Sequence, residues 1–187
     1  MGLIKWFKQR KAIKEELDKI VLEYEESNKL YLDMSIEELK ELDDNDLYQA
    51  VIMRLETKVD RYKDLEAGIE SLIEPQKVAY VLNYFEMEVN NGGLCQFFVN
   101  SSRMCAPYIS DYLEIIGAYK HKTLYDEFVD RYKIDVNDLS SFIVRRTKDY
   151  QKQVERYPFD EFDDLFYELE YFEEKLVNYI RKHIQEY

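Results

Sequence analysis

The sequence predicts an all-α fold, arranged as a single compact domain of roughly nine helices, several of them short. Three observations lead to this prediction. The 187 residues include only 5 Gly and 3 Pro, so helix-breaking residues are scarce. Apolar residues recur at intervals of three and four, the period of an amphipathic helix, and strict alternation over six or more residues is not evident. No internal repeat of fixed period and no Ser/Gly-rich linker divides the chain.

The first predicted helix, within residues 1–30, is basic. Residues 1–20 carry six Lys or Arg and three Asp or Glu, a net charge of +3, whereas the whole chain carries 26 against 39, a net charge of −13. Trp6 and Phe7 lie beside these basic residues, a combination that can bind an anionic membrane surface or a neighbouring subunit. We favour the alternative, in which both rings pack onto the rest of the protein and the lysines face its acidic surface. This helix is interpreted as an addition to a helical domain over 31–187.

Two capping signals come next. Ser35, with Glu38 three residues later, forms a capping box before a predicted helix. Asp44 or Asn45 is expected to cap the following helix, whose apolar positions continue to Tyr62. The sequence therefore predicts two helices between residues 35 and 62.

A longer helix is predicted from Pro75, which suits a first turn because its missing N–H would be unpaired there in any residue. An apolar stripe follows over 78–89. The Asn-Asn-Gly-Gly stretch at 90–93 is expected to end this helix in a sharp turn, since Gly adopts left-handed backbone conformations freely. A short helix is expected over about 94–99.

The second half of the chain shows the same periodicity. Pro107 is expected to open a helix and Gly117 to close it. Apolar spacing predicts helices over about 124–132 and 139–150, and a final pair from about 160 to 187.

Composition excludes several classes of function. The net charge disfavours direct binding to nucleic acid. The mean hydropathy of −0.54 and the absence of an apolar run of about 18 residues argue against a membrane span, and no signal peptide is recognised, so we expect a cytoplasmic protein. Cys95 and Cys105 are too few for a disulfide scaffold, and His121 and His183 lie on separate segments. We predict no metal, no cofactor and no catalytic residues.

The densest local motif is the corner at residues 86–100, where a Gly-Gly turn is surrounded by amides and carboxylates. Adjacent amides can pair the backbone groups that such a turn leaves free. The alternative is a small-molecule pocket, with Glu88 as a base and Gln96 or Asn100 as orienting groups. We favour the structural role, since no nucleophile, metal set or phosphate-binding motif accompanies the corner. The motif residues are Glu88, Asn90, Asn91, Gly92, Gly93, Gln96, Phe97, Phe98 and Asn100.

An acidic segment over 160–174 contains eight carboxylates and no basic residue. Phe162, Leu165, Phe166, Leu169 and Phe172 follow helical spacing, so burying this stripe should turn the carboxylates outward together. Such an array could present negative charges at intervals close to those of DNA phosphates, and a solvated acidic surface is the alternative. A calcium loop is rejected because the segment contains no Gly. The preferred partner-binding residues are Asp160, Glu161, Asp163, Asp164, Glu168, Glu173 and Glu174, with Glu37, Glu38 and Glu41 as second choice.

The stretch 88–100, followed by 115–118 and 159–167, resembles a family of bacterial proteins typified by an acidic DNA mimic protein. The resemblance spans about Ser35 to His183 and leaves the basic first helix outside. It implies an all-helical cytoplasmic protein, a homodimer without known enzymatic activity, whose carboxylates occupy the DNA-binding face of a helix-turn-helix regulator. We therefore expect a non-enzymatic protein that binds a basic partner.

Overall fold

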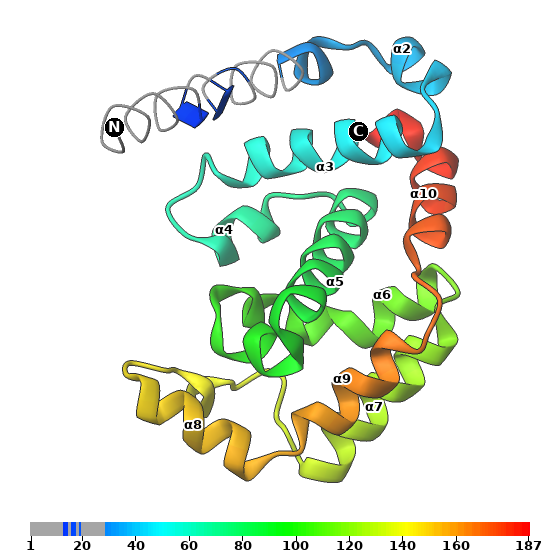
Figure 1. Ribbon diagram of the computed structural model, residues 1–187. Coiled ribbons are helices and arrows are strands. Elements are labelled where there is room, and N and C mark those ends of the chain that lie inside the picture. The colour runs from blue at the N-terminus through cyan, green and yellow to red at the C-terminus, as the bar shows by residue number, and fades with distance from the viewer. Residues whose placement is uncertain (1–12, 15, 18, 20–28) are drawn as a thin grey trace, which may run out of the picture.

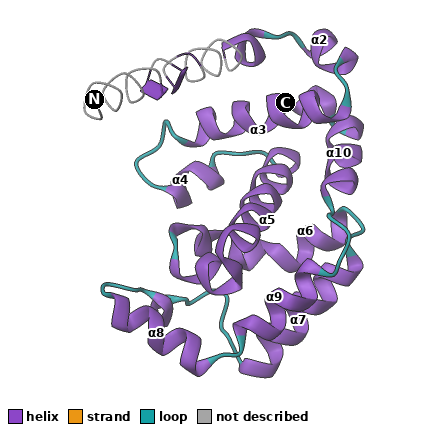
Figure 2. Ribbon diagram, in the orientation of Figure 1, coloured by secondary structure: helices purple, strands orange, loops and turns teal. Residues whose placement is uncertain are grey.

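The computed structural model describes residues 13, 14, 16, 17, 19 and 29–187, and the predictions made for Trp6, Phe7 and most of the basic first helix lie outside this part. The described residues form nine α-helices with full bounds, α2 to α10, and three short 3₁₀-helices, without a strand (Figure 2). The predicted all-α single domain is confirmed. Figure 1 shows α5 running through the middle of the molecule, with α3 near one end and α8 near the other.

The helices α2 (Ile36–Glu41) and α3 (Asp44–Val59) begin with side-chain caps. The predicted capping box is present: the Ser35 hydroxyl accepts from the Glu38 N–H at 3.3 Å, and the Glu38 carboxylate accepts from the Ser35 N–H at 2.7 Å. The cap of α3 is Asp43, which accepts from the Asp46 N–H at 2.9 Å, instead of the predicted Asp44 or Asn45. Local sequence signals thus place both helices to within one or two residues.

One short helix was not predicted. α4 (Leu65–Glu70) lies between α3 and α5, and Asp64 caps it by accepting from the Ala67 N–H at 3.0 Å. With six residues, α4 shows less than two turns of periodicity, too little for the apolar pattern to identify.

The long helix α5 (Glu74–Val99) carries Pro75 in its first turn, as predicted, and is kinked near its end. Asn90 and Asn91 are still helical, and the break falls on Gly92 (φ −163°, ψ 23°) and Gly93 (φ 77°, ψ 176°). The predicted turn is therefore present, two residues later than the start of the Asn-Asn-Gly-Gly stretch. Only glycine adopts the Gly93 conformation without strain.

The rest of the chain is helical with short connections. Its elements are η1 (Ser101–Tyr108), α6 (Ile109–Ile115), α7 (Tyr119–Tyr132), η2 (Ser140–Phe142), α8 (Thr147–Arg156), α9 (Phe159–Tyr167), α10 (Glu173–Lys182) and η3 (Ile184–Glu186). Gly117, at φ 75°, follows the end of α6 as predicted, but Pro107 lies inside η1 and does not open α6. The single helix predicted over 139–150 is wrong: η2 and α8 share this region, with 143–146 between them.

Hydrogen bonds connect α10 and the last residue of the chain to earlier helices. The Arg181 guanidinium donates to the Asp44 carboxylate (Nε to Oδ1, 2.8 Å) and to the Leu42 carbonyl at 2.9 Å. The Tyr187 hydroxyl donates to the Pro75 carbonyl at 2.8 Å. α10 therefore runs between the α2/α3 end of the molecule and the end that holds α9 (Figure 1).

Candidate functional site

Helix α9 carries the first part of the predicted acidic segment, with Glu168 as its C-cap, and aromatic burial orients it. The helical stripe expected to continue to Phe172 is interrupted over 168–172, and Glu173 and Glu174 begin α10. Phe159, Phe162 and Phe166 are 2 to 3% exposed and fix the inner side of the helix. The carboxylates of Asp160, Glu161, Asp164 and Glu168 are exposed on its outer side. Burial of the phenylalanines thus turns these carboxylates outward, as their helical spacing predicts. We call these four carboxylates the α9 face.

Among the described residues, the α9 face lacks ion-pair partners, although Lys120 lines one groove together with Glu168. Within the described residues, no salt bridge joins these four carboxylates, or Glu173 and Glu174 at the start of α10, to a basic side chain. Exposed carboxylates without partners keep their full negative potential toward solvent.

The second-choice carboxylates on α2 are in a different place and a different state. The Lys40 ammonium lies 3.2 Å from a Glu37 oxygen, and its hydrogen bond and charge lower the pKa of Glu37. Glu38 is engaged in the capping box, where its hydrogen bonds to Ser35 lower its pKa. Figure 1 shows α2 and α9 at different ends of the molecule with α10 between them. The structure gathers the carboxylates of α9 and places those of α2 apart from them.

Asp163 differs from its neighbours because it points toward the α5 kink. Its Oδ1 accepts a hydrogen bond of 2.8 Å from the backbone N–H of Leu94. Leu94 is the first residue after the Gly-Gly break. A Cβ on Gly93 would lie 2.0 Å from the other carboxylate oxygen, Oδ2, so only glycine allows this approach. Asp163 therefore caps the second half of α5 and is not a member of the α9 face. No local signal in the sequence reveals this role, since the two residues that Asp163 contacts lie about seventy positions away.

The position of Asp163 gives a testable dependence on pH. Burial, helped by the charges of Asp160 and Asp164, raises its pKa to about 6, and the Leu94 hydrogen bond partly opposes the rise. Because the pKa of Asp163 is higher in the folded state, protonation favours folding. This stabilisation is present below about pH 4, the ordinary range of an Asp pKa, and is lost as the pH rises through about 6, the folded-state pKa. Asp163→Asn keeps the shape and the acceptor, and solvent screens part of the shift at this half-buried position. Relative to this variant, the wild type should therefore lose about 1 to 2 kcal/mol of unfolding free energy between pH 4 and pH 7, measured by urea denaturation. Glu161→Gln, at an exposed position whose charge is not among those acting on Asp163, should show no such difference; an equal slope for both variants would contradict the assignment.

The Asn/Gly corner is held together by Glu88. This carboxylate, 7% exposed, accepts from the Gln96 side-chain amide at 2.7 Å and from the Asn100 amide at 3.0 Å (both to Oε2). The three side chains join the two halves of α5 across the kink. Because both amides are bonded to Glu88, the geometry favours the structural interpretation of the motif over a pocket with a free base.

Phe97 and Phe98 fit the same interpretation, whereas, among the described residues, Asn90 and Asn91 do not pair backbone groups of the turn as expected. Phe97 and Phe98 are fully buried in the core, and the side chains of Asn90 and Asn91 are exposed. The aromatic pair therefore anchors the short segment after the kink to the rest of the domain.

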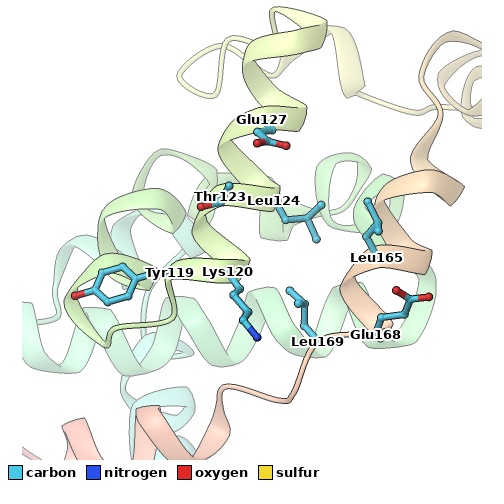
Figure 3. Close-up of a pocket in the computed structure, with 8 residues that line it drawn as sticks. All are labelled: Tyr119, Lys120, Thr123, Leu124, Glu127, Leu165, Glu168 and Leu169. Carbon is cyan, nitrogen blue, oxygen red and sulfur yellow. The ribbon is translucent and has the colours of Figure 1, made fainter.

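A groove between α7 and α9 was not predicted from the sequence. The two helices are antiparallel, since Phe128 contacts Phe159 (ring centroids 5.4 Å apart) and His121 contacts Phe166 (5.2 Å). Figure 3 shows Leu124, Leu165 and Leu169 directed into one space of about 490 Å³. Leu165 was expected in the buried stripe but is 52% exposed, because the three phenylalanines of α9 already fill the inner side.

The rim of this groove is polar and carries two carboxylates and one ammonium group. Glu127 lies on the α7 side and Glu168 on the α9 side, and Lys120 and Thr123 also line the space (Figure 3). An apolar floor between carboxylates suits an amphipathic, basic helix or segment of a partner protein. The groove extends the α9 face by adding apolar contact area to its negative charge.

The described residues offer little to a metal ion or a reactive thiol. Among them, no group of three or more His, Cys, Asp or Glu side chains could hold a metal. Cys95 and Cys105 are both buried and unpaired, and burial raises the pKa of Cys95 to about 11, which disfavours the reactive thiolate. Burial lowers the pKa of His121 to about 4, so this side chain is neutral at physiological pH. No helix in the described ranges is both long enough and apolar enough to cross a membrane.

In the part of the chain that the structure describes, the fold and the site together define a class: a helical protein with an exposed acidic face on one helix and a kinked central helix that supports it. Residues 70–183 match the family described as DMP19-like protein, which is more than half of the chain, and the protein belongs to that family. The matched range includes the kink and α9 but begins at residue 70, later than the Ser35 expected from the resemblance. Comparison with curated proteins found no match, and neither did comparison with solved structures.

Proposed function

We propose that the protein is a non-enzymatic interaction protein that uses the α9 face and the adjoining groove to bind a basic partner, in the manner of a DNA mimic. The observation that carries the proposal is the set of four exposed carboxylates, on α9 and its C-cap, that form no ion pair with any described residue. Membership of the DMP19-like family is compatible with it. The preferred partner is a DNA-binding regulator, such as a helix-turn-helix protein, whose positive face normally contacts phosphate.

The spacing of charges supports this choice of partner. Side chains three or four positions apart on a helix lie about 5 to 6 Å from one another, and Asp160, Asp164 and Glu168 follow this spacing. Phosphates along one DNA strand are separated by about 3.4 Å of helix axis. Residues four apart on an α-helix rise about 6 Å, so this row of carboxylates is a little more than half as dense as one DNA strand. The leucines of the groove supply apolar contact that DNA backbone lacks.

A charge reversal tests the proposal. The variant Asp160→Lys, Glu161→Lys, Asp164→Lys leaves the structural Asp163 in place, and its recovery of a basic partner from native lysate at low salt should fall at least about tenfold, since each close charge pair contributes on the order of 1 kcal/mol or more. The partner recovered from the lysate should bind duplex DNA. Wild-type protein should displace this DNA from the partner, and the lysine variant should not.

A matched control separates the α9 face from net charge. Glu66→Lys, Asp111→Lys, Glu155→Lys changes the charge by the same amount at exposed positions on α4, α6 and α8. This variant should retain the partner. Equal loss in both variants, or no loss in either, would contradict the assignment to α9.

The other expectations from the sequence stay predictions. A ligand pocket at the Asn90 to Asn100 corner is the alternative function, and a metabolite that raises the melting temperature in wild type but not in Asn91→Ala would favour it. The homodimer implied by the resemblance is tested by sedimentation.

A further inference from the structure

A second cavity, of about 260 Å³, lies between α3, α5 and the turn that precedes α10. It is separate from the groove between α7 and α9, because the two share no lining residue. The side chains around it are Tyr48, Asn83, Glu86, Met87, Asn90, Tyr171 and Glu173. Two of them are carboxylates, and none is basic.

Glu86 is the unusual member of this cavity. Its side chain is 7% exposed, and its Oε1 is shielded from solvent without a hydrogen-bond partner in the described part of the chain. A buried carboxylate oxygen without a partner is costly, and native proteins rarely leave one unsatisfied. The Glu86 oxygen is therefore a group that a ligand could satisfy.

The surroundings of Glu86 favour a positively charged ligand. Glu173 adds a second negative charge at the cavity. The Tyr48 hydroxyl donates to the Asn83 side-chain oxygen at 2.7 Å, so this donor is not available to Glu86. Tyr171, 72% exposed, offers an aromatic face, which attracts ammonium and guanidinium groups.

An organic cation fits this cavity better than a metal ion. Calcium takes six to eight oxygen ligands, whereas only two carboxylates line the cavity, and no metal-holding cluster occurs among the described residues. A single ammonium or guanidinium group, in contrast, is satisfied by one or two carboxylates and an aromatic ring.

We propose that this cavity binds a ligand carrying one ammonium or guanidinium group, with Glu86 as its ion-pair partner and Glu173 and Tyr171 as supporting contacts. This inference goes beyond the proposed function, since it involves neither the α9 face nor a DNA-binding partner. The state of the carboxyl supports it: burial, with a contribution from the Glu173 charge, raises the pKa of Glu86 to about 7 against a lowering hydrogen bond from the Phe172 backbone. At pH 8 the group is mostly ionised, and a bound cation would offset its charge.

Met87 provides a local probe for the test. The chain has 5 methionines, and of those that the structure describes Met87 alone lines this cavity. The full chain is labelled with ¹³C in its methionine methyl groups, and the Met87 signal is identified through Met87→Leu. At pH 8, n-butylammonium and n-butylguanidinium should each shift this signal saturably, and the uncharged 1-butanol should not.

Variants connect the signal to the proposed ion pair. Glu86→Gln keeps the shape of the side chain and removes its charge, and it should weaken binding of both cations at least about tenfold, the usual effect of losing a charge-assisted partner. Glu66→Gln, an exposed carboxylate on α4, should leave the affinity unchanged. The Asp160, Glu161, Asp164 lysine variant should also retain it, which distinguishes this site from the α9 face.

A lysine peptide distinguishes the two sources of the cation, a basic side chain of a partner protein and a small metabolite. Acetyl-Ala-Lys-Ala-amide carries the same ammonium group on a peptide backbone, and acetyl-Ala-norleucine-Ala-amide is its uncharged control. Tighter binding of the lysine peptide than of n-butylammonium assigns the site to a basic side chain of a partner protein; tighter binding of the free amine assigns it to a small metabolite. The proposal is overturned if no cation shifts Met87 saturably, or if 1-butanol or the Glu86→Gln protein gives the same response.

Discussion

Gly93→Ala should lower the free energy of unfolding by about 3 kcal/mol. Two effects contribute. The backbone of Gly93, at φ 77° and ψ 176°, lies in a region that residues with a Cβ enter only at a cost of about 1 to 3 kcal/mol. The new Cβ would also approach Asp163 Oδ2 to 2.0 Å, so the carboxylate must move and give up its hydrogen bond to Leu94, about 1 kcal/mol more. Urea denaturation followed by circular dichroism measures the sum.

Two controls separate these effects. Gly117 has a similar φ of 75°, but its nearest heavy atom would be 3.9 Å from the new Cβ, so Gly117→Ala should cost only the backbone strain. In an Asp163→Ala background the space beside Gly93 is empty, and Gly93→Ala should cost less there than in wild type. Equal costs for Gly93→Ala and Gly117→Ala, or no coupling to Asp163, would disprove the close approach at the kink.

Phe98→Ala should lower the free energy of unfolding by about 3 to 5 kcal/mol, the usual range for a fully buried phenylalanine. Phe98 is completely buried, and its ring lies 5.0 Å from that of Phe142 and 6.3 Å from that of Phe159, measured between centroids. The side chain therefore joins the segment after the kink to η2 and α9, and truncation leaves a cavity among three elements.

Two control substitutions test the result for Phe98: one changes the size of its side chain less, and the other removes an exposed aromatic ring. Phe98→Leu keeps much of the volume and should cost clearly less than Phe98→Ala. Tyr119→Ala removes an aromatic ring that is 64% exposed and should change stability by no more than about 0.5 kcal/mol. A cost for Phe98→Ala close to that of Tyr119→Ala would contradict the central place of Phe98 in the core.

Much of the fold could be predicted because its signals are local. The Ser35 capping box, Pro75 in a first turn and the Gly-Gly break each act within a few residues of the chain. The errors fall where local signals are weak: α4 is too short to show periodicity, Pro107 is accommodated in a 3₁₀-helix, and η2 and α8 share one apolar pattern.

The candidate site was only partly predictable. Helical spacing correctly turns the carboxylates of α9 outward, since this depends only on which side of the helix is apolar. The inward position of Asp163 depends on Leu94, and the exposure of Leu165 depends on the position of α7. Neither tertiary contact can be read from the period of one segment. Glu86 was missed for the same reason, because its neighbours Tyr48 and Tyr171 come from distant parts of the chain.

The contacts between α9 and the kinked helix have a consequence for recognition. The Tyr167 hydroxyl donates to the Val89 carbonyl at 2.8 Å, and Asp163 bonds to Leu94, so α9 is fastened to α5 on both sides of the break. A surface fixed in this way is preorganised: little conformational entropy is lost when a partner docks on it. Substitutions within α5 should therefore change the affinity for a partner that α5 does not contact, because they weaken the hydrogen bonds that hold α9 in position.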